Sequence, residues 1–483
     1  MCQIAARITS VATALSPTQA THSNTTAPAL FPAQVNAGLT KRKPYSQNCT
    51  IIHPTGSTPM PELAINGGSK TVNRDLRQPW PVHDKREEKA VVGVLRSHKW
   101  GRSGFDYYNH GDSKLYAFER AFAEFHDSKY ALAVSTGTTA LETCLRALGV
   151  EAGCEVIVPA STYIASASCV MICNGIPIFA DIDPRNYTID PKSVEALITP
   201  RTRAVVAVDM GGMPCDTDAL GDICRKHNIG LVSDCSHAHG GQWRGKGVGS
   251  HADIAGFSCM PGKVLAIGEG GVVMTRDESL YEKAFRYHHA GRDRGEESMN
   301  FTWPATTLRL GEFEAAIGLI ALTRLEEQAE IRWKNLKYLH KGMESIPGLT
   351  GLDIDERVTR WNPYRWHFKF ISEEFEGIHR ERFRKALQAE GVPCGIGPTK
   401  PLYQFSMFAS GKWGETGCPI RCPLYQADPI DYTKVYCPEA ERIHETEALD
   451  LTHRILLGPR ENMDLILEAF QKLRDNIDEL KTS

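Results

Sequence analysis

The sequence predicts an α/β fold in which a mainly parallel sheet is covered by helices on both faces and is followed by a smaller C-terminal α/β domain. Short apolar runs alternate with helical patterns between residues 130 and 257, which is typical of buried parallel strands joined by helices. A helical pattern over residues 310–343 then leads into a tail that mixes a strand pattern with helices. The 483 residues are enough for two or three domains.

Each expected element follows from local periodicity. Strands are expected where β-branched and apolar residues run together, at residues 130–134, 155–159, 176–180, 204–208, 231–234 and 254–257. Helices are expected where apolar residues recur every three or four positions, at residues 115–126, 140–148, 163–174, 218–227 and 310–343. The tail is expected to hold a strand at residues 366–371 and helices at 380–390 and 463–479.

These patterns divide the chain into an N-terminal extension (1–59), a large cofactor-binding domain (60–343) and a small C-terminal domain (344–483). Residues 1–59 are rich in Ala, Thr, Ser and Pro and contain no acidic residue. Such a composition buries too little apolar surface to offset the entropy of ordering, so this extension is predicted to be disordered. Arg7 is its only basic residue before Lys41, whereas a targeting peptide usually carries several basic residues. We therefore favour a working protein that begins near Met60.

The composition narrows the class of protein. Hydrophobic residues make up 42% and charged residues 23%, with a formal net charge of -3, which gives no electrostatic bias toward nucleic acid or anionic membranes. No window has the roughly 18 apolar residues that a membrane span needs. The 14 cysteines lack zinc-site spacing, so we expect no metal and a reducing, cytoplasmic setting.

One pair of residues suggests chemistry. The strand at residues 231–234 ends on Asp234, and ligands of open α/β sheets bind at that edge. Lys263 follows on a turn between Pro261-Gly262 and the glycine-rich segment 268–271. Catalysis with pyridoxal 5'-phosphate uses such a lysine to bind the cofactor covalently and such a carboxylate to keep its ring nitrogen protonated. Taken alone, this spacing more often marks an ordinary strand end and a surface lysine.

Five motifs in order carry a family resemblance. They are TGTTAL (136–141), GCEVIVPASTYIAS (153–166), SDCSHAHGG (233–241), FSCMPGK (257–263) and GEGGVVMT (268–275). Together they resemble the DegT/DnrJ/StrS group of sugar and aminocyclitol aminotransferases. The resemblance runs from about residue 61 to about residue 473. It implies fold type I of the pyridoxal phosphate enzymes, pyridoxal 5'-phosphate as cofactor, and a homodimer with active sites at the interface.

The resemblance also implies roles for individual residues. Lys263 matches the cofactor-binding lysine, and Asp234 matches the partner of the pyridine nitrogen. His237 matches a hydrogen-bond donor to the cofactor's phenolic oxygen, and Tyr163 matches an aromatic ring that stacks on the pyridine. The phosphate contacts are implied at Gly137, Thr138, Thr139 and Ser258.

One position departs from the family pattern. Relatives usually carry Gly-x-Asn-x-Arg before the long helix, and the Asn reaches the partner's phosphate, whereas this chain reads Ala-Thr-Thr-Leu-Arg at 305–309. Thr307 has a shorter reach, which puts the cross-subunit contact in doubt. Arg309 matches the motif and fits either a substrate anion or a salt bridge at the helix start.

The C-terminal segments 397–404 and 437–458 resemble the branch that holds scyllo-inosose aminotransferases and 3-amino-5-hydroxybenzoate synthases. The first hypothesis is therefore transfer of an amino group, from L-glutamine or L-glutamate, to a keto-cyclitol or keto-sugar. A dehydratase of the 3-amino-5-hydroxybenzoate synthase type is the second. A catalytically idle homologue is the third, and Thr307, together with Cys259 in the otherwise familiar motif 257–263, gives it weight.

Overall fold

The computed structural model describes residues 62–482 except 103–110, 297, 299 and 414. The predicted disordered extension, 1–59, lies outside the described residues. From Pro61 onward the chain forms one compact unit. Within it, no described helix has both the length and the apolar character needed to cross a membrane.

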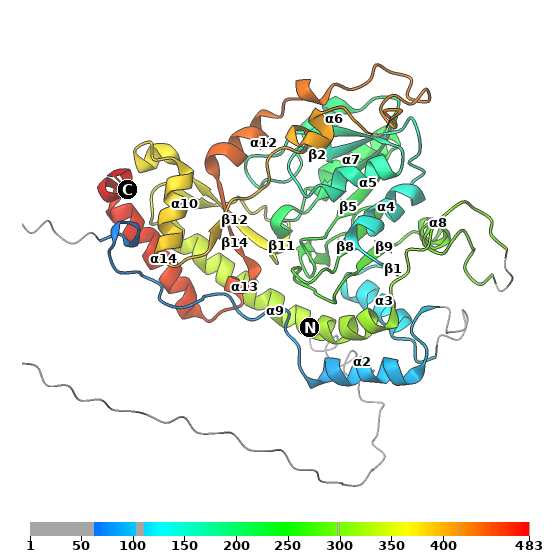
Figure 1. Cartoon of the computed structure of the whole chain (residues 1–483), viewed down its shortest axis with the longest axis horizontal. Helices are drawn as coiled ribbons and strands as arrows, with labels where there is room; N and C mark the ends of the chain where they lie inside the picture. Colours follow the sequence, from blue (N-terminus) through cyan, green and yellow to red (C-terminus); the bar gives the residue numbers. More distant parts are fainter. Residues whose placement is uncertain (1–61, 103–110, 297, 299, 414, 483) are drawn as a thin grey trace, which may run out of the picture. The chain divides into compact units, whose positions relative to one another are not determined.

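A seven-stranded sheet forms the centre of the large domain (Figure 1). Its spatial order is β1 (Tyr130–Val134), β9 (Gly271–Thr275), β8 (Ile254–Ser258), β5 (Gly230–Asp234), β4 (Thr202–Val208), β2 (Glu155–Pro159) and β3 (Ile176–Ala180). The pairs from β8 to β3 are parallel, and β9 runs antiparallel to both β8 and β1. The expected mainly parallel sheet is therefore confirmed, with β9 as the one reversed strand.

Helices cover both faces of this sheet, and alternate residues of each strand point to different cores. In β1, Leu132 and Val134 join the core beneath α4 (Gly137–Ala147), α5 (Ala165–Ile172) and α8 (Glu278–His288). Ala131 and Ala133 join the opposite core, formed with α3 (Lys114–Phe125) and α9 (Glu312–Met343). Farther along the sheet, α6 (Pro191–Leu197) and α7 (Thr217–His227) complete that second layer. This two-faced burial explains why the strands are apolar throughout.

The long helix α9 connects the large sheet to the C-terminal elements. It contacts α2 (Lys85–Ser97) and α3 near its start, and β10 (Leu349–Gly351), α13 (His453–Leu456) and α14 (Arg460–Asp475) farther along (Figure 1). A second sheet has the order β10 (Leu349–Gly351), β12 (Arg365–Phe370), β14 (Ala448–Thr452) and β13 (Cys394–Gly395). A small third sheet joins β11 (Val358–Arg360) to β6 (Gln242–Trp243) and β7 (Lys246–Gly247), so the C-terminal chain also pairs with the large domain.

The remaining C-terminal helices are mostly short. They are α10 (Arg380–Ala389), α11 (Ser406–Ala409), α12 (Pro438–Arg442), α13 (His453–Leu456), α14 (Arg460–Asp475) and α15 (Ile477–Thr482). The single helix expected at 463–479 is wrong, because Asn476 leaves the helical region (φ -118°, ψ 43°) and separates α14 from α15. The helix expected from residue 163 begins only at Ala165. The division between residues 343 and 344 stays a prediction.

The sheet places several loops at one edge. β4, β5 and β8 are parallel neighbours, with Val208 opposite Asp234 and Asp234 opposite Gly256. β1 runs in the same direction as β8, since both are antiparallel to β9. The chain leaves the carboxyl ends of β1, β5 and β8 toward Gly137, His237 and Lys263. This edge is where ligands of such sheets bind.

Candidate active site

Asp234 lies at the end of β5 and is held by neutral donors. The Ser166 hydroxyl donates to its Oδ2 at 2.9 Å, and the Ser236 backbone N–H donates to its Oδ1 at 3.2 Å. The residue is only 5% exposed. Among the described residues it forms no salt bridge. A buried carboxylate that forms no salt bridge within the described part of the chain is suited to a cation supplied by a ligand.

Lys263 presents its amine in a nearly dry environment. Its side chain lies in a turn closed by a hydrogen bond from Lys263 N to Met260 O at 2.9 Å, and the residue is 8% exposed. Burial lowers its pKa from 10.5 to about 8, against the opposing charge of Asp234. Its Nζ lies 4.4 Å from the centre of the Tyr364 ring. The amine is therefore neutral in a far larger fraction of molecules than an exposed lysine at the same pH.

His237 stands beside this lysine with one ring nitrogen already occupied. The Gly211 backbone N–H donates to His237 Nδ1 at 3.3 Å. In a neutral ring the proton must then lie on Nε2, which leaves Nε2 as a donor. Burial and the neighbouring Lys263 hold the pKa of His237 well below its usual range, so the ring is neutral. Its ring packs 4.8 Å from that of Tyr364.

The N-terminus of α4 faces the end of β8. The Thr136 hydroxyl caps the helix by accepting a hydrogen bond from Thr139 N at 3.1 Å. In return, the Thr139 hydroxyl accepts a hydrogen bond from Thr136 N at 3.0 Å. Thr139 is thus engaged in the cap, and the amides of Gly137 and Thr138 have no partner among the described residues. A Cβ added to Gly137 would lie 2.4 Å from the Cβ of Ser258. Only glycine lets these two segments meet, and free amides at a helix start suit a phosphate.

Tyr163 and Thr307 lie at the margin of this group. Tyr163 is 64% exposed just before α5, one turn ahead of the Ser166 that holds Asp234. Thr307 is exposed and its backbone bridges to His289. Neighbouring Arg309 contacts His289 Nδ1 at 3.1 Å through its Nη1, and it forms no salt bridge with a described residue. We call Asp234, His237, Lys263 and Tyr364 the lysine cluster. None of these side chains contacts Thr307.

Sequence reasoning missed Ser166 and Tyr364. Ser166 lies inside a quoted motif, and its place one turn into a helix that follows a strand could have indicated contact with the strand ends. Tyr364 comes from just before β12, about a hundred residues after Lys263, and no local pattern connects the two positions. His239 is fully buried against Phe122 and Phe257 and is part of the packed core.

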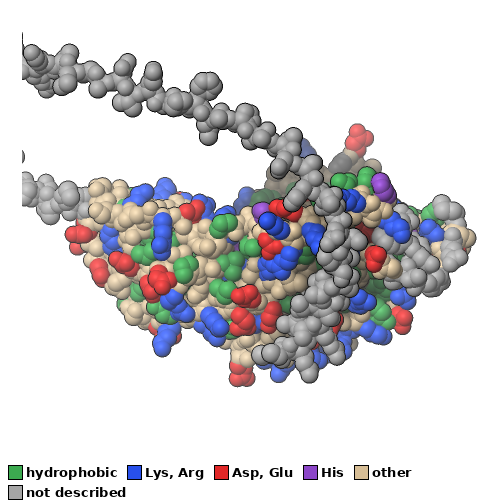
Figure 2. Space-filling view, turned by 90° about the horizontal axis from the view of Figure 1, so that it is seen from below, with side chains coloured by type: hydrophobic (Ala, Val, Ile, Leu, Met, Phe, Trp, Pro, Cys, Tyr) green, Lys and Arg blue, Asp and Glu red, His purple; other side chains and the backbone are tan. Residues whose placement is uncertain are grey.

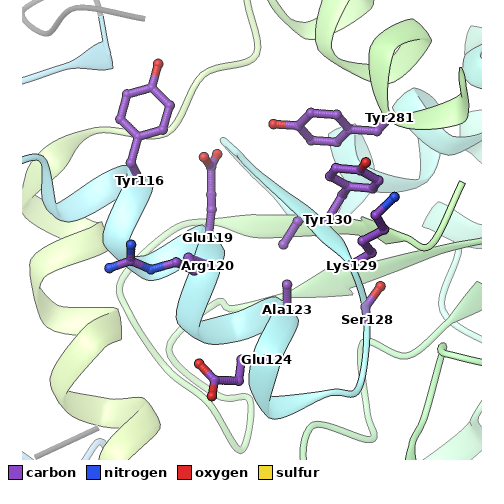
Figure 3. A pocket seen from close by; sticks show the side chains of 10 residues that line it. Tyr116, Glu119, Arg120, Ala123, Glu124, Ser128, Lys129, Tyr130 and Tyr281 are labelled. Carbon is purple, nitrogen blue, oxygen red and sulfur yellow. The ribbon is translucent and has the colours of Figure 1, made fainter. Parts of the chain in front are cut away.

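A separate surface hollow lies between α3, β1 and α8 (Figure 3). It is lined by Tyr116, Glu119, Tyr130 and Tyr281 among others, and none of the predicted site residues borders it. Charges of both signs are interspersed over the face seen in Figure 2. Among the described residues, no group of three or more His, Cys, Asp and Glu side chains is placed to hold a metal ion. The lysine cluster therefore remains the candidate active site.

A buried amine, a carboxylate at a strand end and a free helix N-terminus fit the aldehyde, ring nitrogen and phosphate of pyridoxal 5'-phosphate. The fold and this site define a pyridoxal phosphate-dependent aminotransferase. Residues 82–421 match the DegT/DnrJ/EryC1/StrS aminotransferase family model, and the chain belongs to this family. Pyridoxal phosphate is the cofactor that the family implies.

The chain is similar to several curated proteins over nearly their whole length. It is 35% identical to a putative L-glutamine:3-amino-2,3-dideoxy-scyllo-inosose aminotransferase of Streptoalloteichus tenebrarius, covering 87% of this chain and 99% of that protein. It is 34% identical to the L-glutamine:scyllo-inosose aminotransferase of Streptomyces griseus (86% and 99%). A 3-amino-5-hydroxybenzoate synthase of Amycolatopsis mediterranei is also 34% identical (78% and 92%).

Solved structures agree with this fold. The crystal structure of a 3-amino-5-hydroxybenzoic acid synthase superposes with a TM-score of 0.72 at 31% identity, covering 85% of this chain and all of that one. An aminotransferase from Psychrobacter cryohalolentis gives the same TM-score at 29% identity, covering 83% and 100%. The predicted fold type is thereby confirmed.

Proposed function

We propose that this aminotransferase moves an amino group from L-glutamine to a keto-cyclitol. The support is the activity for which its relatives are named, since several carry the name of L-glutamine:inosose aminotransferases at 33–35% identity. The observation that carries the catalytic part is the buried Lys263 amine beside the Asp234 carboxylate and the neutral His237. A keto-sugar and L-glutamate are the broader choices of acceptor and donor.

Lys263 is proposed to bind the cofactor and to move the proton. Bound pyridoxal phosphate supplies an electron-withdrawing ring that stabilises negative charge at the carbon bearing the transferred nitrogen. With the cofactor bound, Lys263 Nζ would serve as the base that takes the proton from that carbon and as the acid that returns it to the cofactor carbon on the other side of the nitrogen. Its lowered pKa serves this role, because a base works best when its pKa is near the working pH.

Asp234 and His237 are proposed to set the charge around the ring. Asp234 keeps its carboxylate in place through Ser166 and Ser236, and so keeps a proton on the pyridine nitrogen. His237 donates from Nε2 to the phenolic oxygen, because its Nδ1 is occupied by Gly211 N. Neither role requires the side chain to move from the place where its own chain holds it.

The remaining contacts are proposed from position. The free amides of Gly137 and Thr138, with the Ser258 hydroxyl, hold the phosphate, and Thr139 contributes by shaping the cap. Tyr163 is exposed one turn before Ser166, which holds Asp234, and its ring stacks on the pyridine. We infer a homodimer that works in the cytoplasm. Exposed Trp303 and Phe301, close in sequence to Thr307, support an interface that includes that segment.

The test is to load the purified protein with pyridoxal phosphate and to follow the absorbance of the bound cofactor in the violet region of the spectrum, called the violet band below. The band should disappear on borohydride reduction and be absent in Lys263→Ala. L-glutamine alone should convert the band to that of the pyridoxamine form, and one member of a panel of keto-cyclitols and nucleotide keto-sugars should restore it. Absence of the band in the wild-type protein would contradict the proposal and leave an idle homologue.

A dehydratase of the 3-amino-5-hydroxybenzoate synthase type is the second candidate. It is favoured by the 34% identity to a curated synthase of this kind and by the superposition on the crystal structure of a 3-amino-5-hydroxybenzoic acid synthase. Both reactions use the same lysine, so the loaded protein alone does not separate them. A loaded enzyme that L-glutamine leaves unchanged, but that eliminates water from an aminocyclohexenone acid, would favour the dehydratase.

A further inference from the structure

The turn that carries Lys263 is held through its main chain by two distant side chains. His453 Nε2 lies 3.1 Å from the carbonyl oxygen of Gly262, and Trp80 Nε1 donates to the carbonyl oxygen of Lys263 at 3.1 Å. Among the described residues, neither carbonyl has a backbone partner. Since a buried carbonyl without a donor is costly, these two contacts fix the direction of consecutive peptide groups at the lysine.

The proton of His453 can be assigned from its other neighbour. Arg332 Nη2 lies 3.3 Å from His453 Nδ1, and a guanidinium can only donate. His453 Nδ1 must therefore accept, and the ring proton lies on Nε2, facing Gly262. Burial and the charge of Arg332 hold the pKa of His453 well below its usual range, so the ring stays neutral. The bond to the lysine turn thus has a fixed donor.

Trp80 is locked against the same pair. Its ring meets His453 edge-on, with centroids 4.7 Å apart and planes at 84°. The guanidinium of Arg332, fully buried on α9, lies 5.3 Å from the centre of the Trp80 ring. One buried cation therefore supports both donors, through a hydrogen bond to His453 and a cation–π contact with Trp80.

Trp80 reaches this place on a strap formed by residues 62–80. Two carboxylates tie its start to the C-terminal elements: Glu390 accepts from Ala64 N at 2.8 Å, and Glu479 accepts from Leu63 N at 3.0 Å. Near its end, Gln78 N donates to Arg454 O at 3.1 Å, one residue after His453. Hydrogen bonds to ionised carboxylates are strong, so they fix the start of the strap. The backbone bond from Gln78 fixes its end.

We propose that Trp80 and His453 are positioning residues for Lys263, and that the strap is part of the catalytic unit. The inference rests on the proposed function of Lys263 as the cofactor-binding amine. Neither residue is assigned contact with the reacting atoms; both act through the carbonyls of Gly262 and Lys263. A small displacement of a reacting amine costs a large factor in rate, so a lost main-chain bond should slow attachment of the cofactor.

The first test compares Trp80→Phe with Trp333→Phe. Phenylalanine keeps an aromatic ring at position 80 but removes the N–H donor. Trp333 packs partly buried on the same helix as Arg332 and donates no hydrogen bond to any described residue, which makes it the matched control. We expect Trp80→Phe to slow the appearance of the violet band, after pyridoxal phosphate is added to cofactor-free enzyme, by about tenfold. The kcat should fall by a similar factor, with KM for L-glutamine nearly unchanged, while Trp333→Phe behaves as the wild type.

A second pair tests the other donor and guards against misfolding of the first. His453→Gln keeps an N–H group near the position of Nε2, and His453→Leu removes it. We expect the glutamine variant to recover most of the wild-type rate of band formation and the leucine variant to lose about tenfold. If Trp80→Phe and His453→Leu form the band as fast as Trp333→Phe and His453→Gln, the positioning role is wrong. If the wild type forms no band, the proposed function fails first.

Discussion

Two faces of the candidate active site differ in how their residues are connected along the chain. The motif face consists of Gly137, Asp234, His237, Ser258 and Lys263, which lie at or just beyond the carboxyl ends of β1, β5 and β8, at one edge of the sheet. The covering face consists of Trp80, Tyr364 and His453. Trp80 comes from the N-terminal strap, while Tyr364 and His453 flank the paired ends of β12 and β14, where Arg365 lies opposite Thr452. The motif face supplies charge and hydrogen-bond donors. The covering face supplies burial and fixes the lysine.

The largest effect should come from the motif face. Asp234→Ala removes the only carboxylate assigned to the ring nitrogen, so we expect kcat to fall by at least about a hundredfold. The affinity for pyridoxal phosphate should change much less, because the phosphate and the lysine remain. Single-turnover conversion to the pyridoxamine form measures the first quantity, and equilibrium dialysis measures the second. An equal loss in both would mean that Asp234 acts mainly in binding.

A smaller effect is expected where α4 meets β8. Gly137→Ala places a methyl group 2.4 Å from Ser258 Cβ and 2.9 Å from its backbone, so we expect about 1–3 kcal/mol of destabilisation and weaker binding of pyridoxal phosphate. Gly93→Ala is the matched control, since nothing lies within 4 Å of its added Cβ in α2. It should stabilise the protein by up to about 1 kcal/mol. Thermal unfolding with and without cofactor compares the two variants. A Gly137→Ala protein that binds cofactor normally would contradict the phosphate assignment.

The covering face can be tested at Tyr364. Tyr364→Phe keeps the ring beside Lys263 Nζ and His237, and should change kcat by no more than about twofold. Tyr364→Leu opens this face to water, which should raise the pKa of Lys263 toward 10.5 and lower kcat near neutral pH by about tenfold. Steady-state rates across a pH series separate the variants. If phenylalanine is as damaging as leucine, the hydroxyl rather than burial is the important feature.

The smallest effect is the pH dependence of cofactor attachment. The pKa of Lys263 is lowered to about 8, so its amine is mostly protonated at pH 7 and half neutral near pH 8. The attachment rate should rise about fivefold over that unit and level off above it. Stability follows the same cause: the unfolded chain keeps the Lys263 proton between about 8 and 10.5, so this amine contributes stability to the cofactor-free protein that rises with pH through that window. Buried thiols with raised pKa values, such as that of Cys259, act in the opposite direction. Stopped-flow absorbance tests the first statement, and a Lys263→Met protein should attach no cofactor at any pH. The difference in urea unfolding between the wild type and Lys263→Met, followed across the pH series, isolates the second.

The sequence predicted the motif face and the large sheet more fully than the covering face. Strands such as residues 130–134 and 155–159 were predicted with their observed bounds, because buried parallel strands are apolar runs that end at turns. Asp234 and Lys263 follow such strands, so their shared edge could be inferred from topology. Trp80 and His453 contact the Lys263 turn, which is far away in the sequence. These contacts depend on how the strap and α13 pack against that turn, and the local periodicity of the sequence does not predict such packing. The break at Asn476 was missed for a related reason, since the apolar pattern continues on both sides of it.

The central claim is that Lys263 carries the cofactor. The most direct measurement is borohydride reduction of the protein loaded with pyridoxal phosphate, followed by proteolysis and mass spectrometry of the lysine-containing peptides. The added mass should lie on the peptide that contains Lys263, and the Lys263→Ala protein should neither show the violet band nor acquire that mass. A reduced adduct on another lysine, or a violet band that survives in Lys263→Ala, would contradict the account.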